Sequence, residues 1–161
     1  MDDSVQRETV IEDRVDARAP VHLWIVGLLA LLWNGFGCYD YLMTRMRNTD
    51  YLASMMPTVD PNDTLAWVDS FPVWAQFGWG LGVWAGLIGS LLLLLRHRWA
   101  VPALTLSLVG AILGLGYQIV AAAPLPGAEG AMFEVVPYVI ILVAAAVAYY
   151  AHVMRRKGVL R

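Results

Sequence analysis

Long apolar runs alternate with short polar stretches along this chain, and the pattern predicts an all-α protein, a four-helix transmembrane bundle. At about 1.5 Å per helical residue, each run is long enough to cross a hydrocarbon core of about 30 Å. Apolar residues are continuous within each run instead of following one helical face, which favours a membrane bundle over a soluble domain with a membrane tail. The predicted spans cover residues 21–43, 72–95, 99–123 and 133–154.

Polar segments flank and connect these spans. Residues 1–20 carry six acidic and three basic side chains, so we expect a disordered or interfacial tail, and residues 155–161 form a short basic tail. Residues 44–71 are the one sizeable loop. Within that loop, Asp60 followed by Pro61 is typical of a helix start. We expect a partly helical loop that packs on the end of the bundle, with a binding cap as the alternative.

Composition supports a membrane protein. Of 161 residues, 59% are apolar and 15% are charged, the mean hydropathy is +0.59, and soluble domains usually have about 25% charged residues. A formal net charge of -2 leaves no electrostatic footprint for nucleic acid. Cys38, the single cysteine, rules out an intramolecular disulfide.

The distribution of bases predicts the orientation. Nine Lys and Arg residues fall in the two tails and in the connection at residues 96–98, against two in residues 44–71 and none in the last connection. Because bases accumulate on the cytoplasmic side, both termini are expected inside, and the 44–71 loop is expected to be extracytoplasmic.

Two polar residues interrupt the first span. An unpaired amide in hydrocarbon costs several kcal/mol, so Asn34 should bond across helices to Ser107, Gln118 or a backbone carbonyl. Asp40 should lie near the outer interface, in water, with Arg47 as an exposed ionic partner. The alternative is a polar pathway for a substrate or ion. Its candidate residues are Asn34, Tyr39, Asp40, Tyr41 and Gln118.

Small residues define faces on the next two spans. In the second span they recur every four residues, as Gly78, Gly82, Gly86 and Ser90. Such a stripe lets two backbones approach closely, which predicts helix packing within the chain or between two chains, with a ligand groove as the alternative. In the third span, small residues around Ser107 should face inward, and the bulky face that begins at Leu104 should meet lipid.

No motif of enzymatic chemistry is present. The sequence contains no glycine-rich phosphate loop, no metalloprotease pair of histidines and no close pair of acids at membrane depth. His22, His97 and His152 all fall near the predicted cytoplasmic ends of spans, where a haem or metal site is geometrically conceivable. We expect no enzymatic activity and no cofactor, and keep a haem- or metal-binding subunit as an alternative.

Four motifs resemble a known group. They are His22-Leu23-Trp24-Ile25-Val26 before Leu32-Trp33-Asn34-x-x-Gly37, Pro72-x-Trp74, Gly89-x-Leu91-Leu92-Leu93-Leu94-x-Arg96-x-x-x-x-Pro102, and Lys157-Gly158. Over most of residues 22–158 the chain resembles small bacterial four-span membrane proteins that are often labelled "sugar transporter". The resemblance implies a multi-pass protein of the bacterial inner (cytoplasmic) membrane and carries over no site residue.

The sequence favours a non-enzymatic structural or accessory module, working in a membrane complex or a homo-oligomer. The alternative is a transporter or facilitator for a small, sugar-like solute that acts as an oligomer, because four spans alone leave little room for alternating access. The expected partners are the lipid bilayer and other membrane subunits or a second copy of the chain.

Overall fold

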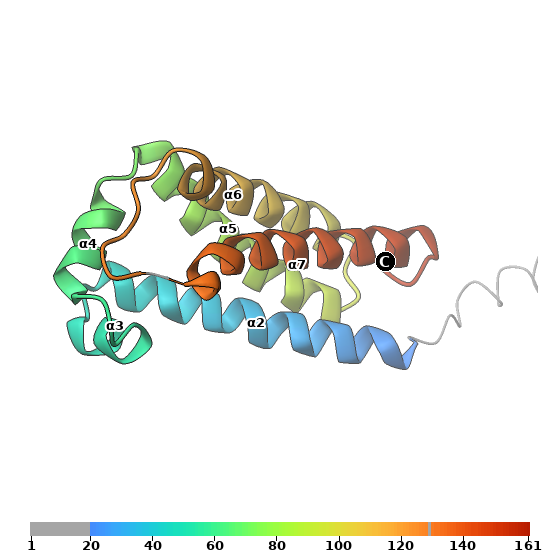
Figure 1. Ribbon diagram of the computed structural model, residues 1–161. Helices are drawn as coiled ribbons and strands as arrows, with labels where there is room; N and C mark the ends of the chain where they lie inside the picture. Colours follow the sequence, from blue (N-terminus) through green and yellow to red (C-terminus); the bar gives the residue numbers. More distant parts are fainter. Residues whose placement is uncertain (1–19, 129) are drawn as a thin grey trace, which may run out of the picture.

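The computed structural model describes residues 20–128 and 130–161, and over those ranges the chain is helical without strands. Four of its six described helices are long and apolar enough to cross a membrane, which confirms the predicted fold class and makes this an integral membrane protein. The tail expected at residues 1–20 lies, except for Pro20, outside the described residues. The four long helices are α2 (Val21–Arg45), α5 (Val73–Leu94), α6 (Ala100–Val120) and α7 (Ala131–Arg156) (Figure 1).

The predicted spans agree with these helices to within three residues at each end. The largest difference is at the end of α6, which stops at Val120 instead of residue 123. The following residues lead to Pro124, and residues before a proline are biased away from helix. In α7 the helix continues through Pro137, which lies in its second turn.

The loop between α2 and α5 contains two short helices, α3 (Thr49–Met55) and α4 (Pro61–Asp69). Asn48 caps α3 by accepting a bond from the Tyr51 backbone N–H (2.9 Å), and Asp60 caps α4 by accepting from that of Asn62 (2.8 Å). A left-handed backbone at Arg47, φ 56°, separates α3 from α2. Both short helices lie across one end of the bundle, here called the loop end (Figure 1).

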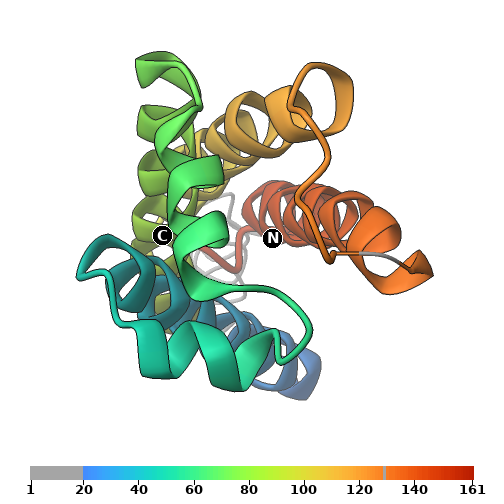
Figure 2. The same cartoon turned by 60° about the vertical axis from the view of Figure 1, so that its left-hand side comes forward.

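A central pair, α5 and α6, carries one further helix on each side. The α5–α6 contact is the most extensive, α2 packs on α5, and α7 packs on α6. The first and last spans, α2 and α7, meet where the His22 side chain and the Tyr150 hydroxyl are hydrogen-bonded. They do not pack against each other along the rest of their length, so the bundle is open there (Figure 2).

Glycines set the closest approach of α5 to α6. A Cβ atom added at Gly110 would lie 2.7 Å from Gly82 Cα, so the two backbones touch there. One turn away, a Cβ atom at Gly78 would lie 3.0 Å from the Gly114 nitrogen. The remaining members of the α5 stripe, Gly86 and Ser90, face Asn34 of α2. The stripe therefore packs within the chain against two different helices.

The prediction that the bulky face of α6 meets lipid is wrong at Leu104. Leu104, expected to meet lipid, is only 3% exposed. A Cβ atom at Gly89 would lie 2.7 Å from Leu104 Cγ, so this leucine occupies the space that Gly89 leaves open. The bulky face is thus divided, because Ile112, further along, is 50% exposed.

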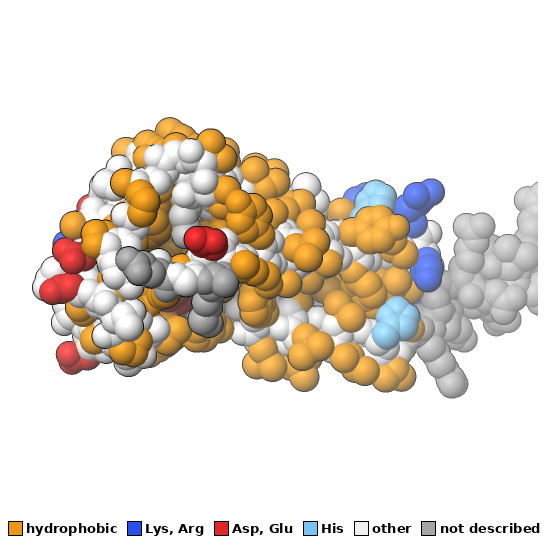
Figure 3. Space-filling model, viewed as in Figure 1, with side chains coloured by type: hydrophobic (Ala, Val, Ile, Leu, Met, Phe, Trp, Pro, Cys, Tyr) orange, Lys and Arg blue, Asp and Glu red, His pale blue; other side chains and the backbone are white. Residues whose placement is uncertain are grey.

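The end opposite α3 and α4, here called the basic end, is closed by the last residues described. The Arg98 backbone N–H donates to the Arg161 carbonyl (2.7 Å), and the Arg161 N–H donates to the Arg96 carbonyl (2.8 Å). Between these bonds Val159 and Leu160 are buried among Leu23, Leu93 and neighbouring apolar side chains. Figure 3 shows a broad apolar surface between the two ends, with Lys and Arg at the basic end and most acidic side chains at the loop end.

Candidate functional site

A cavity of about 230 Å³ lies between the four long helices. Its walls are mostly apolar, with polar side chains contributed by α2 and α6. The lining residues are Trp33, Asn34, Phe36, Gly37 and Asp40 of α2; Trp79, Gly82 and Val83 of α5; Leu104, Ser107, Ala111 and Leu115 of α6; and Val136, Ile140, Val143, Ala144 and Val147 of α7.

Asn34 lies in the wall of this cavity and joins α2 to α5. Its Nδ2 donates to the Ala30 carbonyl (2.8 Å) and to Ser90 Oγ (3.0 Å). The close approach depends on Gly86, because any Cβ atom at that position would collide with the Asn34 amide. Of the expected partners, Ser107 and Gln118 are wrong, because Ser90 accepts the bond across helices and Ser107 bonds to Gly82. A backbone carbonyl is a partner, but it belongs to Ala30 of the same helix.

Ser107 joins α6 to α5 beside Asn34, since both side chains lie against Gly86. Its hydroxyl donates to the Gly82 carbonyl at 2.6 Å, and its side chain is buried. The same glycine that allows the α5–α6 backbone contact thus also accepts a hydrogen bond beside it. Such hydrogen bonds between helices satisfy polar groups that water does not reach within a bilayer.

Asp40 lies nearer the loop end and lines the same cavity. Its Oδ1 accepts a hydrogen bond from the Tyr51 hydroxyl at 2.9 Å. The expected ion pair with Arg47 is wrong: Arg47 Nη1 binds Asp69 Oδ2 at 2.9 Å. The turn at Arg47 is the cause, because it directs the chain into α3, so that Tyr51 comes back over Asp40.

Tyr51 is a site residue that the sequence did not reveal. Burial, reinforced by the hydrogen bond to Asp40 and by that negative charge, raises its pKa above the ordinary tyrosine value. The hydroxyl therefore stays a neutral donor toward Asp40 at physiological pH. Tyr39 packs edge-on against the Tyr51 ring, with 5.3 Å between centroids.

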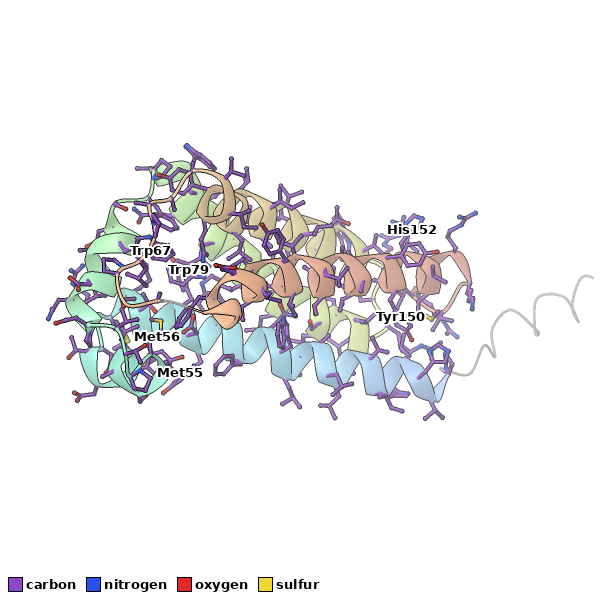
Figure 4. All side chains as sticks on the ribbon, viewed as in Figure 1. Met55, Met56, Trp67, Trp79, Tyr150 and His152 are labelled. Carbon is purple, nitrogen blue, oxygen red and sulfur yellow. The ribbon has the colours of Figure 1, made fainter. Side chains whose placement is uncertain are left out.

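The other candidate pathway residues lie outside the cavity. Tyr41 contacts Trp79 edge-on (4.9 Å between centroids), and Tyr39 contacts the site through Tyr51. Gln118, on α6, is half-buried and does not line the cavity. Trp79, which was not among the candidate residues, does line it, and Figure 4 shows it with Trp67 toward the loop end.

The three histidines are separated. His22 Nδ1 and the Tyr150 hydroxyl are hydrogen-bonded, and His97 Nδ1 accepts from the Trp99 backbone N–H at 3.2 Å. His152 is exposed near Tyr150 at the basic end (Figure 4). Within residues 20–128 and 130–161, no group of three or more His, Cys, Asp or Glu side chains is arranged to hold a metal ion.

Comparison of the chain with protein-family models, with curated proteins and with solved structures finds no match. The fold and the cavity therefore define the class of protein. It is an integral membrane protein with four long helices and a mostly apolar cavity that a few polar side chains line.

Proposed function

We propose that this protein binds a small, mostly apolar molecule in the cavity between its four helices, without catalysing a reaction. The observation that carries the proposal is the cavity itself, which all four long helices line and which contains the polar residues Asn34, Asp40 and Ser107. Binding sites in helical bundles have this character: largely apolar walls and a few polar groups that fix orientation.

The size of the cavity supports an occupant. The cavity opens toward the bilayer past the partly exposed Trp33 and Phe36, so an apolar molecule can fill it. A sealed cavity of 230 Å³ left empty would cost on the order of 5 kcal/mol at about 24 cal/mol per Å³. That is comparable with the whole stability of many domains, which is roughly 5 to 15 kcal/mol. Because α2 and α7 do not pack along their length beyond His22 and Tyr150, an occupant could reach the cavity from the bilayer.

The lining favours an apolar ligand over a sugar. A sugar carries a hydroxyl group on most of its carbons, and each buried hydroxyl needs a partner. The polar side chains in the lining are those of Asn34, Asp40 and Ser107, beside the indoles of Trp33 and Trp79. The cavity lining therefore does not support sugar transport, which the label of the resembling proteins implies.

A second candidate, the accessory module or homo-oligomer, is favoured by the exposure of α7. Only 11% of its most apolar window is buried within the chain, against 39% for α5. A helix of another subunit, or of a second copy, would then cover α7 and close the open side of the bundle.

The proposal predicts that filling the cavity abolishes binding of an apolar probe. Ala144 lines the cavity and Ala146, on the same helix, is exposed, so Ala144→Phe and Ala146→Phe form a matched pair. In lipid nanodiscs, neopentylbenzene should raise the melting temperature of the parent and of Ala146→Phe by roughly 2 to 4 °C for each kcal/mol of binding. Ala144→Phe should not respond.

Partitioning of the probe into lipid affects all three proteins alike, so the comparison isolates the cavity. An identical response in all three, or none in any, would contradict a ligand site. The accessory module would then be the better account of the open α2–α7 side.

A further inference from the structure

We infer that the ligand is a lipophilic cation, an amine or quaternary ammonium with an apolar body, and that Asp40 is its counter-ion. This inference rests on the proposed function and adds the chemical class of the ligand.

Charge is the first support. Asp40 is the one charged residue among the described residues that line the cavity. The two arginines at this end have other partners: Arg45 Nη1 donates to Gln76 Oε1 (3.0 Å), and Arg47 is paired with Asp69 (2.9 Å). A carboxylate with no base beside it attracts a cation strongly in a cavity of low dielectric constant.

The unused hydrogen-bonding capacity of the polar side chains points the same way. Asp40 Oδ1 accepts from Tyr51, and across the described residues Oδ2 has no donor. Asn34 Nδ2 donates both of its hydrogens, to the Ala30 carbonyl and to Ser90 Oγ, so the amide can only accept further bonds. The Ser107 hydroxyl likewise donates its hydrogen to the Gly82 carbonyl. These three side chains can therefore accept hydrogen bonds from the N–H groups of a protonated amine. A quaternary ammonium has no N–H group, and the charge of Asp40 and the faces of aromatic rings attract it instead.

Aromatic rings supply the third support. Trp33 and Phe36 on α2 and Trp79 on α5 line the cavity together with Asp40. Cations are attracted to the faces of such rings, most strongly to indoles and most strongly where water is excluded. Trp33 and Phe36 are also 44% and 53% exposed, so the ring-lined wall extends to the surface of the bundle.

An isosteric pair of probes tests the inference. Benzyltrimethylammonium and neopentylbenzene have the same shape, and they differ in a central nitrogen that carries a charge and a central carbon that does not. Equilibrium dialysis of radiolabelled benzyltrimethylammonium against nanodiscs of zwitterionic lipid should show binding to the parent. Asp40→Asn should weaken that binding about tenfold or more, whereas Asp40→Glu should keep it within a few-fold.

The neutral probe serves as the control for folding and for the cavity. Neopentylbenzene should raise the melting temperature of the parent and of Ala146→Phe, whose substitution lies outside the cavity, and Ala146→Phe should also bind the cation like the parent. If neopentylbenzene raises the melting temperature of the parent while the cation does not bind, or binds Asp40→Asn as well as the parent, the cation inference fails and the proposed function stands. If neither probe binds the parent, both fail.

A measurement on the parent protein covers the case in which Asp40→Asn does not fold. Benzyltrimethylammonium should protect Asp40 from modification by a carbodiimide, read by mass spectrometry of the peptide, and neopentylbenzene should protect it far less. Equal protection by the two probes, or none, would overturn the role of Asp40 as counter-ion.

Discussion

Asn34 is a structural residue as well as a wall of the cavity. Its amide donates to Ser90 across the α2–α5 contact and to Ala30 within α2. Ser90 in turn donates to the Gly86 carbonyl, and it is fully buried. The amide therefore positions α2 on α5, and α2 carries Asp40 into the site.

A double-mutant cycle should detect this bond. Asn34→Ala and Ser90→Ala should each destabilise the protein. The pair should show a coupling free energy of about 0.6 kcal/mol, which is the average for hydrogen bonds between membrane helices. Unfolding in mixed micelles, followed by circular dichroism, measures it.

Thr105 provides the control for that cycle. Its hydroxyl bonds within α6, to the Val101 carbonyl (2.8 Å). Asn34→Ala and Thr105→Ala should therefore add to within about 0.5 kcal/mol. Additivity in the Asn34/Ser90 pair as well would show that the amide bond does not hold α2 to α5.

The sequence identified Asn34 and Asp40 because a polar group in an apolar run is costly and needs a reason. It could not identify the partner of Asp40. That partner depends on a left-handed turn at Arg47, where the residue is not a glycine and gives no signal. Arg47 and Tyr51 were both within reach along the sequence, and the direction of that turn decides between them.

At the scale of elements, the glycine stripe of α5 was visible in the sequence, but its division between two helices was not. Gly82 meets Gly110 of α6, whereas Gly86 admits Asn34 of α2. A four-residue period predicts which face of α5 makes contacts, but it does not predict which helix each residue contacts. In the structure, α2 and α6 pack against neighbouring parts of that face. The buried position of Leu104 could not be predicted either, because it depends on Gly89. That glycine lies outside the stripe but leaves a space that the leucine fills.

Two glycines of α6 offer a matched test of the helix contact. Gly110→Ala places a methyl group against the backbone of Gly82, and should destabilise the protein by about 1 to 3 kcal/mol. At Gly116 a Cβ atom meets nothing within 4 Å, so Gly116→Ala should be neutral or stabilise the protein by about 0.5 to 1 kcal/mol. Thermal unfolding in one detergent compares the two, and equal effects would mean that the backbones do not touch at Gly110.

At the scale of the whole molecule, the number of spans could be predicted, but the open side of the bundle could not. Lipid tails are as apolar as leucine, so the hydrophobic pattern does not distinguish a helix face that meets lipid from one that meets another helix. Small residues reveal the contacts of α5 and α6. In α7, Ala144, Ala148 and Ala151 form a similar stripe, and Ala148 and Ala151 are buried near the basic end. The separation of α7 from α2 over the rest of its length becomes visible only in three dimensions (Figure 2).

The distribution of bases predicts which end of the bundle faces the cytoplasm. In a Cys38→Ser background, Asn62→Cys in α4 should react with an impermeant maleimide added outside intact cells, and Lys157→Cys should react only after the cells are opened. Both positions are exposed, so access is decided by the membrane. Outside labelling at Lys157 would reverse the orientation and place the loop end, with Asp40, toward the cytoplasm.

The wall that α7 contributes to the cavity consists of Val136, Ile140, Val143, Ala144 and Val147, all apolar, whereas the hydrogen bonds beside the cavity join α2, α5 and α6. Substitutions in α7 can therefore change the shape of the cavity without disturbing the polar groups that hold the other three helices together. Over evolutionary time, that separation would let descendants of this protein diverge in the molecules they accept while inheriting an unchanged framework.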